Sequence, residues 1–173
     1  DDNTCRSYDV LGRRRNGGYA EYVSVPAVNC LPYPERLPWE QAAAMPLTTI
    51  TAWEALFDRL QLRIGKPADQ GTLLITGAAG GVGSIAVQLA RVLTATRIVA
   101  TASRPESRAH LEGLGADLVI DHSQPLSKEL QKAGIRWVEH IFSVTHTHLH
   151  FPELARSVAP QGRICVIDDP EPI

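Results

Sequence analysis

The sequence predicts an α/β protein with a doubly wound parallel sheet of the Rossmann type, and three observations lead to this prediction. An apolar run at residues 72–76 ends in a glycine cluster, Gly77-Ala78-Ala79-Gly80-Gly81-Val82-Gly83. After the glycines, apolar residues recur at helical spacing from Val82 to Leu93. Strand-like and helix-like segments then alternate up to residue 167, which implies right-handed crossovers between parallel strands.

The segments after the glycine cluster are expected to follow one another in a fixed order. Runs rich in β-branched and apolar residues predict strands at 97–102, 117–121, 138–144 and 163–167. Helices are expected between them at 105–114, 125–133 and 151–158. This sheet is one strand short of the roughly six in a full dinucleotide-binding sheet, so we expect the last strand to be missing.

The part of the chain before the glycine cluster has a different pattern. Partly alternating residues predict a strand at Tyr19–Val25, and the three prolines of residues 31–38 predict an irregular connector. We expect one helix from Pro38 to Pro46 and a second helix capped by Thr48 or Thr49.

The glycine cluster is typical of a phosphate-binding turn. Glycines let the backbone approach a pyrophosphate closely, and the helix that follows offers free amides to the anion. Alanine stands where the first glycine of the G-x-G-x-x-G motif would be, so a glycine-rich helix entry without a ligand remains an alternative. A Walker phosphate loop is excluded because no Gly-Lys-Ser/Thr follows.

The end of the second strand indicates which dinucleotide is bound. Sheets that bind NAD usually carry an acidic residue there, which binds the ribose 2′-hydroxyl. This chain has Ser103 and Arg104 instead, a hydroxyl and a guanidinium that match a 2′-phosphate. NADP(H) is therefore favoured over NAD, provided that Glu106 stays outside the site as a charge in the first turn of the next helix.

Composition excludes several other classes of protein. The 173 residues carry a net charge of −2 without a basic run, which argues against nucleic acid and anionic membranes as partners. We expect a soluble, cytoplasmic protein, because neither a membrane-spanning stretch nor a signal peptide is evident. Cys5, Cys30 and Cys165 lack the close spacing of a zinc lobe. The first residue is not methionine, which we interpret as a sign that the chain is part of something longer.

Several motifs resemble those of the medium-chain dehydrogenase/reductases, in particular the quinone oxidoreductase-like branch that is often labelled zinc-type alcohol dehydrogenase-like. Besides the glycine cluster, the matching stretches are Asn16-Gly17-Gly18-Tyr19-Ala20-Glu21-Tyr22, Ala42-Ala43-Ala44-Met45-Pro46-Leu47-Thr48-Thr49-Ile50-Thr51-Ala52-Trp53, Thr101-Ala102-Ser103-Arg104-Pro105-Glu106-Ser107, Val119-Ile120-Asp121-His122, Phe142-Ser143-Val144-Thr145-His146-Thr147 and Ala159-Pro160-Gln161-Gly162-Arg163. They occur in the family's order over nearly the whole chain.

The resemblance implies an enzyme that reduces quinones or other α,β-unsaturated carbonyl compounds with NADPH, by hydride transfer. It places the pyrophosphate at Ala79, Gly80, Gly81, Val82 and Gly83, and the 2′-phosphate at Ser103 and Arg104. His122 falls near the adenosine end. Val144, Thr145 and His146 fall near the nicotinamide ribose, and Thr49 is a weaker candidate there.

The resemblance also implies a division into domains. Residues 1–33 correspond to the last part of a GroES-like catalytic domain, 34–70 to connecting helices, and 71–173 to the NADP-binding domain. The rest of the catalytic domain is absent from this sequence, so we expect no metal, name no catalytic residue or proton donor, and leave activity of this chain alone open. In the full-length protein we expect a homodimer that acts on a small-molecule carbonyl or quinone.

Other interpretations remain beside this one. The glycine cluster also fits short-chain dehydrogenases, but their Tyr-x-x-x-Lys pair follows the glycines, and every tyrosine here precedes them. His146, His148 and His150 could suggest a metal, although they lack an adjacent carboxylate or cysteine. A non-catalytic NADP-binding module, or a zinc-dependent alcohol dehydrogenase or enoyl reductase whose ligands lie outside this chain, is the alternative function.

Overall fold

The computed structural model describes residues 11–12, 15–65 and 70–167, and the chain divides into two compact units, Asp1–Pro38 and Trp39–Ile173. The assignment of residues 1–33 to a GroES-like domain stays a prediction. The predicted missing strand concerns residues 168 onwards, which lie outside the described residues.

The strand predicted at Tyr19–Val25 is wrong, because these residues form bends and irregular chain. The side chains of Tyr19 and Tyr22 are almost fully exposed. A strand needs a neighbouring strand to bind its N–H and C=O groups, and none pairs with this segment in the described part of its unit. The connector at 31–38 is irregular as predicted, with a turn in which Leu37 N–H donates to Pro34 O at 2.9 Å.

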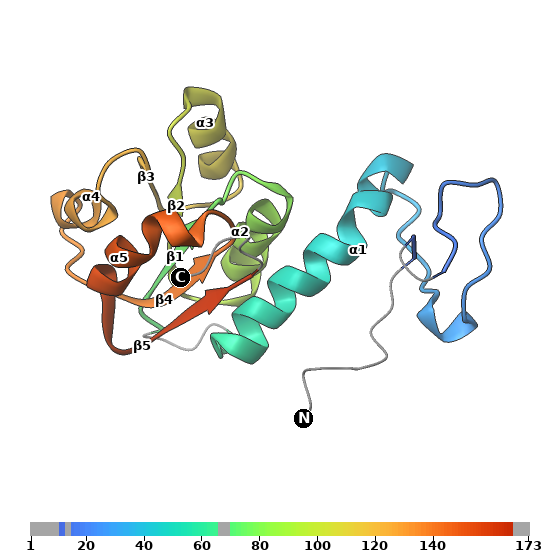
Figure 1. The fold of residues 1–173 in the computed structure, drawn as a ribbon, viewed down its shortest axis with the longest axis horizontal. Coiled ribbons are helices and arrows are strands. Elements are labelled where there is room, and N and C mark those ends of the chain that lie inside the picture. Colours follow the sequence, from blue (N-terminus) through green and yellow to red (C-terminus); the bar gives the residue numbers. More distant parts are fainter. Residues whose placement is uncertain (1–10, 13–14, 66–69, 168–173) are drawn as a thin grey trace. The chain divides into compact units, whose positions relative to one another are not determined.

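The second unit contains the predicted sheet, with all strands parallel and in the order β3-β2-β1-β4-β5 (Figure 1). The strands are β1 (Thr72–Thr76), β2 (Arg97–Thr101), β3 (Leu118–Ile120), β4 (Val138–Ser143) and β5 (Val158–Val166). The helices are α2 (Gly81–Leu93), α3 (Pro105–Gly113), α4 (Leu126–Lys132) and α5 (Thr147–Ser157), preceded by α1 (Trp39–Trp53) and the π-helix η2 (Glu54–Arg59). The fold class is therefore confirmed.

Alternate residues of the strands build a hydrophobic core on each face of the sheet. Leu73 and Ile75 point to the face covered by α2, α3 and the segment α1–η2, whereas Leu74 points to the face covered by α4 and α5. All three side chains are fully buried, and burial of such a side chain stabilises the fold by about 1.5–3 kcal/mol. The continuous apolar run of β1 follows from this position, since both of its faces are covered.

Two boundaries at the end of the sheet differ from the prediction. Helix α5 begins at Thr147, not at 151, and it keeps Pro152 inside. Strand β5 begins at Val158, not at 163, and an irregularity in its register with β4 follows Val138. The sequence pattern hides the early part of β5, because Pro160 and Gly162 are typical of a turn.

The two helices predicted around Pro46 form the single helix α1, so this prediction is wrong. A proline ring removes one helical hydrogen bond and crowds the preceding turn, but Pro46 is exposed, so water can bind the carbonyl group that loses its partner. The Thr48 hydroxyl, predicted as a cap, instead donates back to Ala44 O at 2.7 Å within the continuous helix.

Close packing joins the glycine turn to α2. Gly77 has φ +65°, a left-handed conformation that favours glycine, and it ends β1 in a sharp turn. A Cβ atom on Gly83 would lie 2.5 Å from Ala78 Cα and 2.6 Å from Gly77 O. These are backbone atoms that cannot move aside singly, so the third glycine of the motif is required for the helix to pack on the strand end.

We expect Gly83→Ala to lower the free energy of unfolding by about 1–3 kcal/mol, because the added methyl overpacks the turn. The matched control is Gly113→Ala in α3, where an added Cβ meets nothing within 4 Å. That variant is expected to raise stability by about 0.5–1 kcal/mol through helix propensity. Urea unfolding measures both, and equal stability of the two variants would contradict the packing described for Gly83.

Candidate functional site

A cavity of about 440 Å³ lies at the carboxyl ends of β1 and β2, beside the loops that follow β3 and β4. Parallel α/β sheets bind ligands at this edge, where the strand order reverses, and here the order reverses between β1 and β4. The described residues that line the cavity are Gly77, Ala79, Gly80, Thr101, Ala102, Ser103, Arg104, Ser107, His122 and Thr145.

The glycine turn forms one wall of this cavity. Gly80 N–H donates to Gly77 O at 3.1 Å, and Ser84 N–H donates to Gly80 O at 2.8 Å, so the turn leads directly into α2. Gly80 caps the helix without a side chain, and the first turn of α2 holds no acidic residue. The positive end of the helix dipole and its free N–H groups are therefore available to an anion at Ala79–Gly81.

A free arginine stands at the end of β2. Arg104 is extended, with φ −88° and ψ 140°, and it precedes the first residue of α3. Its exposed guanidinium has no hydrogen-bond or ion-pair partner among the residues that the structure describes. Arg108, one turn further on, is different: its two terminal nitrogens donate to Ala102 O at 3.2 Å and to Val119 O at 2.6 Å.

No carboxylate lines the cavity among the described residues. Glu106 lies in the first turn of α3 and is exposed, as predicted. Asp121, beside His122, accepts a hydrogen bond from Ser123 N–H at 2.9 Å. This bond and one from the Ser123 side chain hold the pKa of Asp121 below its usual range. The wall near Arg104 is therefore cationic and polar.

Two buried polar atoms in the cavity wall lack a partner within the described structure, namely Thr101 Oγ1 and His122 Nδ1. Buried polar groups normally form hydrogen bonds, so such atoms favour a polar ligand in this place. The free N–H groups of the glycine turn, the unpaired Arg104 and these two atoms together fit the phosphates and ribose of a dinucleotide.

The loop between β4 and α5 closes the other side of the glycine turn. Thr145 lines the cavity, whereas Val144 is partly buried against the hydrophobic core. His146 has φ +53° and caps α5, and its Nδ1 lies 2.8 Å from Thr145 Oγ1. A left-handed histidine is uncommon, which indicates that the surrounding structure holds this loop in one conformation.

The structure brings half of the predicted site residues together in this cavity: Ala79, Gly80, Ser103, Arg104, His122 and Thr145. Gly81, Val82 and Gly83 form the first turn of α2 behind it, and Val144 and His146 flank Thr145. Thr49 lines a separate hollow of about 340 Å³ beside Trp53 on α1.

Sequence reasoning missed four residues of the lining, Gly77, Thr101, Ala102 and Ser107. Gly77 carried a signal, since a glycine directly after an apolar run marks a turn that needs positive φ. Ser107 carried one too, because it lies one helical turn after Ser103 at the start of α3. Thr101 and Ala102 read as ordinary strand residues.

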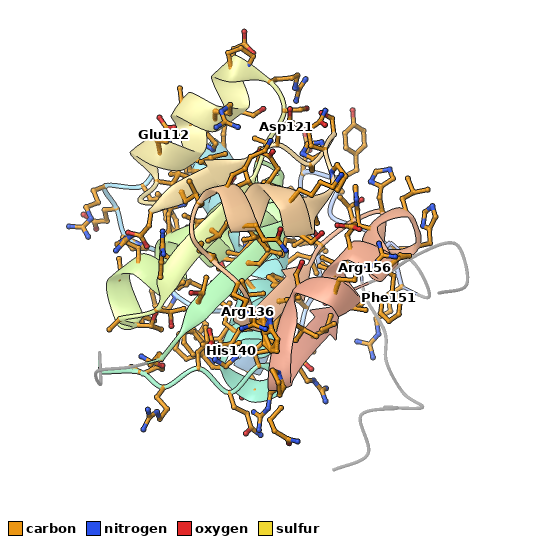
Figure 2. The ribbon with its side chains drawn as sticks, turned by 90° about the vertical axis from the view of Figure 1, so that its left-hand side faces the viewer. Glu112, Asp121, Arg136, His140, Phe151 and Arg156 are labelled. Carbon is orange, nitrogen blue, oxygen red and sulfur yellow. The ribbon has the colours of Figure 1, made fainter. Side chains whose placement is uncertain are left out.

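A larger hollow of about 540 Å³ opens at the opposite edge, near Gln70, Glu139 and His140. Figure 2 shows this separation, with His140 low on the sheet and Asp121 above, beyond the end of β3. At the amino ends of parallel strands the helices present their C-termini, so the helix N-termini that favour a phosphate ligand are not there. We therefore place the site at the carboxyl edge, despite the smaller volume there.

The described residues offer no group of three His, Cys, Asp or Glu that could hold a metal ion. His148 and His150 lie on α5, and His150 meets His122 edge to face, with ring centroids 6.3 Å apart. Cys30 and Cys165 are free thiols, and Cys5 lies outside the described residues. The described residues therefore do not fit a zinc site. Every helix among the described residues is too short or too polar to span a bilayer.

Comparison with known proteins agrees with the fold. Residues 81–168 match the family model described as zinc-binding dehydrogenase. A zinc-type alcohol dehydrogenase-like protein of Staphylococcus epidermidis is 35% identical over 154 residues, which are 88% of this chain and 46% of that protein. The family model covers half of this chain, so the chain belongs to the zinc-binding dehydrogenase family. The resemblance to the medium-chain dehydrogenase/reductases is confirmed.

Solved structures lead to the same family. This chain is 34% identical to an NAD-dependent alcohol dehydrogenase of known crystal structure, with a TM-score of 0.82. The alignment covers 95% of this chain and 47% of the dehydrogenase. The quinone oxidoreductase of Pseudomonas syringae pv. Tomato DC3000 is 30% identical, with a TM-score of 0.64. That alignment covers 81% of this chain and 42% of the oxidoreductase. The chain thus spans about half the length of the relatives it matches.

We expect the stability of this chain to fall as the pH is lowered from 7 toward 5. Burial, followed by the nearby His122, His146 and His148, lowers the pKa of His150. A folded pKa below the unfolded value of about 6.5 means that acid protonates the unfolded chain first, so stability is lost as the pH falls through that window.

His150→Gln should make this loss smaller, because glutamine does not titrate. Urea unfolding at a series of pH values measures it. Carboxylates with lowered pKa values, such as Asp121, affect the pH dependence of stability only at lower pH, near or below about 4. An identical pH dependence in the variant and the wild type would show that His150 does not contribute.

Proposed function

We propose that this chain binds NADPH at the carboxyl edge of the sheet and forms the cofactor-binding part of an oxidoreductase. The enzyme reduces quinones or other small α,β-unsaturated carbonyl compounds by hydride transfer. The observation that carries the proposal is the single cavity in which the glycine turn, the end of β2 and the loop after β4 meet. Membership of a dehydrogenase family supports the reaction type.

The glycine turn would hold the pyrophosphate. Ala79, Gly80 and Gly81 are exposed; Ala79 and Gly81 present backbone N–H groups, whereas Gly80 N–H donates to Gly77 O. Val82 and Gly83 fix the first turn of α2 behind them. An anion in this position interacts with the helix dipole as well as with the N–H groups. We assign these five residues to the pyrophosphate.

Ser103 and Arg104 would hold the 2′-phosphate that distinguishes NADPH from NADH. Arg104 has a free guanidinium, and its planar fork can donate two hydrogen bonds to phosphate oxygens. The absence of a carboxylate from the described lining removes the group that normally binds a ribose 2′-hydroxyl and repels a phosphate. One solved relative is named NAD-dependent, so NADH is the proper ligand for comparison.

The remaining residues divide between the two ends of the dinucleotide. We assign His122 to the adenosine end, where its buried Nδ1 is available to a polar group. Val144, Thr145 and His146 are assigned to the nicotinamide ribose, and Thr49 stays a weaker candidate because it lines a different hollow.

NADPH, when bound, supplies the hydride. This chain's residues bind and orient the cofactor, and they bury part of it away from water. No proton donor is assigned within the chain. The homodimer and the cytoplasmic location remain predictions for the full-length protein.

Arg104→Ala is expected to weaken NADPH binding by about ten- to a hundredfold, because a hydrogen bond to a charged group contributes roughly 1.5–3 kcal/mol. Binding of NADH should change by less than about twofold, since it lacks the 2′-phosphate. Fluorescence energy transfer from the tryptophans to the nicotinamide measures both affinities.

Arg97→Ala is the matched control, because Arg97 is an exposed arginine at the amino end of the same strand. It should leave both affinities unchanged. Equal losses of NADPH affinity in the two arginine variants would reduce the role of Arg104 to long-range charge. Binding of neither nucleotide by the wild type would overturn the proposed function.

A second candidate is a non-catalytic NADP-binding module, because no described residue that lines the cavity is assigned a part in catalysis. Consumption of NADPH in the presence of a quinone, followed by absorbance, separates it from an enzyme. A zinc-dependent alcohol dehydrogenase or enoyl reductase with ligands outside this chain is distinguished by activity that a chelator removes.

A further inference from the structure

Three buried hydroxyl groups form a chain beneath the candidate site. Ser143 Oγ lies 3.1 Å from Thr76 Oγ1 and 2.8 Å from Thr147 Oγ1. Thr76 ends β1, Ser143 ends β4, and Thr147 begins α5. All three residues are at most 2% exposed. Water therefore has little access to these hydrogen bonds.

This hydroxyl chain joins the two segments that face each other across the site. Thr76 directly precedes Gly77 of the glycine turn, and Ser143 and Thr147 enclose the loop Val144–His146. A backbone hydrogen bond also joins the two segments, because Val144 N–H donates to Thr76 O at 3.3 Å. The position of the loop relative to the turn is thus fixed by side chains and backbone together.

The loop lies so close to the turn that only glycine fits between them. A Cβ atom on Gly77 would lie 2.7 Å from Thr145 Cγ2 and 3.3 Å from Val144 Cβ. The left-handed conformation of His146, with φ +53°, is unfavourable for a residue other than glycine. Such a conformation persists only where neighbouring contacts hold it, and the hydroxyl chain spans both ends of the loop.

The strand order shows which half of a dinucleotide this loop would meet. Arg104 follows β2 and the glycine turn follows β1, so a dinucleotide with its 2′-phosphate at Arg104 extends from β2 across β1. The half beyond the pyrophosphate then lies over β4, on the other side of the point where the strand order reverses. On the proposed function, that half is the nicotinamide ribose.

We propose that the hydroxyls of Thr76, Ser143 and Thr147 are positioning groups that hold the loop Val144–His146 at the distance from the glycine turn that the nicotinamide half of the cofactor requires. They act through the loop and do not touch the ligand. The proposal rests on the proposed function, and it assigns to these three residues an effect on one half of the ligand only.

The test compares two ligands on Ser143→Ala. NADPH carries both halves, whereas adenosine 2′,5′-bisphosphate carries the adenosine half and the 2′-phosphate without nicotinamide. We expect the variant to bind NADPH about tenfold more weakly and to bind the bisphosphate within about twofold of the wild type, because removing Ser143 leaves two buried hydroxyls with an unmade bond. Calorimetric titration measures both affinities.

Thr147 gives an independent pair of variants if Ser143→Ala folds poorly. Thr147→Val keeps the shape and removes the hydroxyl, so NADPH affinity should fall while affinity for the bisphosphate stays constant. Thr147→Ser keeps the hydroxyl and should restore NADPH affinity. The matched control is Ser157→Ala, because Ser157 is a buried α5 hydroxyl that donates to Glu153 O at 2.7 Å in its own helix.

The outcomes separate the positioning role from a purely structural one. Equal weakening of both ligands, or no weakening of either, would overturn the positioning role and leave the proposed function intact. Loss of NADPH affinity in Ser157→Ala as large as in Ser143→Ala would overturn it as well, since general loosening of α5 would explain both. A wild type that binds neither ligand would overturn the cofactor site itself, and the positioning role with it.

Discussion

The close approach of two backbone segments at the end of β1 is the constraint on which the candidate site depends. Gly83 brings the first turn of α2 against Ala78, and Gly77 brings the loop after β4 against the turn. Neither contact leaves room for a side chain. Because both segments are held at this point, the N-terminus of α2 and the loop Val144–His146 face one shared space, and the end of β2 faces it from the side.

The site combines rigid parts with exposed ones, and the division follows from the fold. The strand ends are fully buried between two helical layers, so Thr76 and Ser143 are fixed by packing as well as by their hydrogen bond. Arg104, by contrast, lies at the surface with a free guanidinium. Arg104 can therefore bind a ligand phosphate without first breaking another interaction. The loop Val144–His146 needs little reorganisation to meet the nicotinamide half of the ligand.

The sequence was most informative where one local rule determined the structure. The run before Gly77 and the helical spacing after Val82 predicted strand, turn and helix, because burial on both faces of β1 favours apolar residues at Leu73, Leu74 and Ile75. The sequence was least informative where contacts with distant parts of the chain, or their lack, determined the local structure. Tyr19–Val25 alternates like a strand but has no partner in its described unit, and Pro46 is tolerated inside α1 because it is exposed.

The same distinction applies to the site. Ser103 and Arg104 could be predicted, because their type and their place after β2 carry the chemistry. Thr101 could not, since a strand threonine becomes notable only when the structure shows its buried hydroxyl without a partner in the described part of the chain. The link from Thr76 to Ser143 spans strands far apart in sequence, and no local pattern marks it.

A crystal structure of this chain with bound NADPH would show where each part of the cofactor lies. We predict that the pyrophosphate lies at the N–H groups of Ala79 and Gly81, that the 2′-phosphate contacts Arg104, and that the nicotinamide ribose lies beside Thr145. A dinucleotide seated in the opposite hollow near His140, or with its 2′-phosphate turned away from Arg104 into solvent, would contradict it.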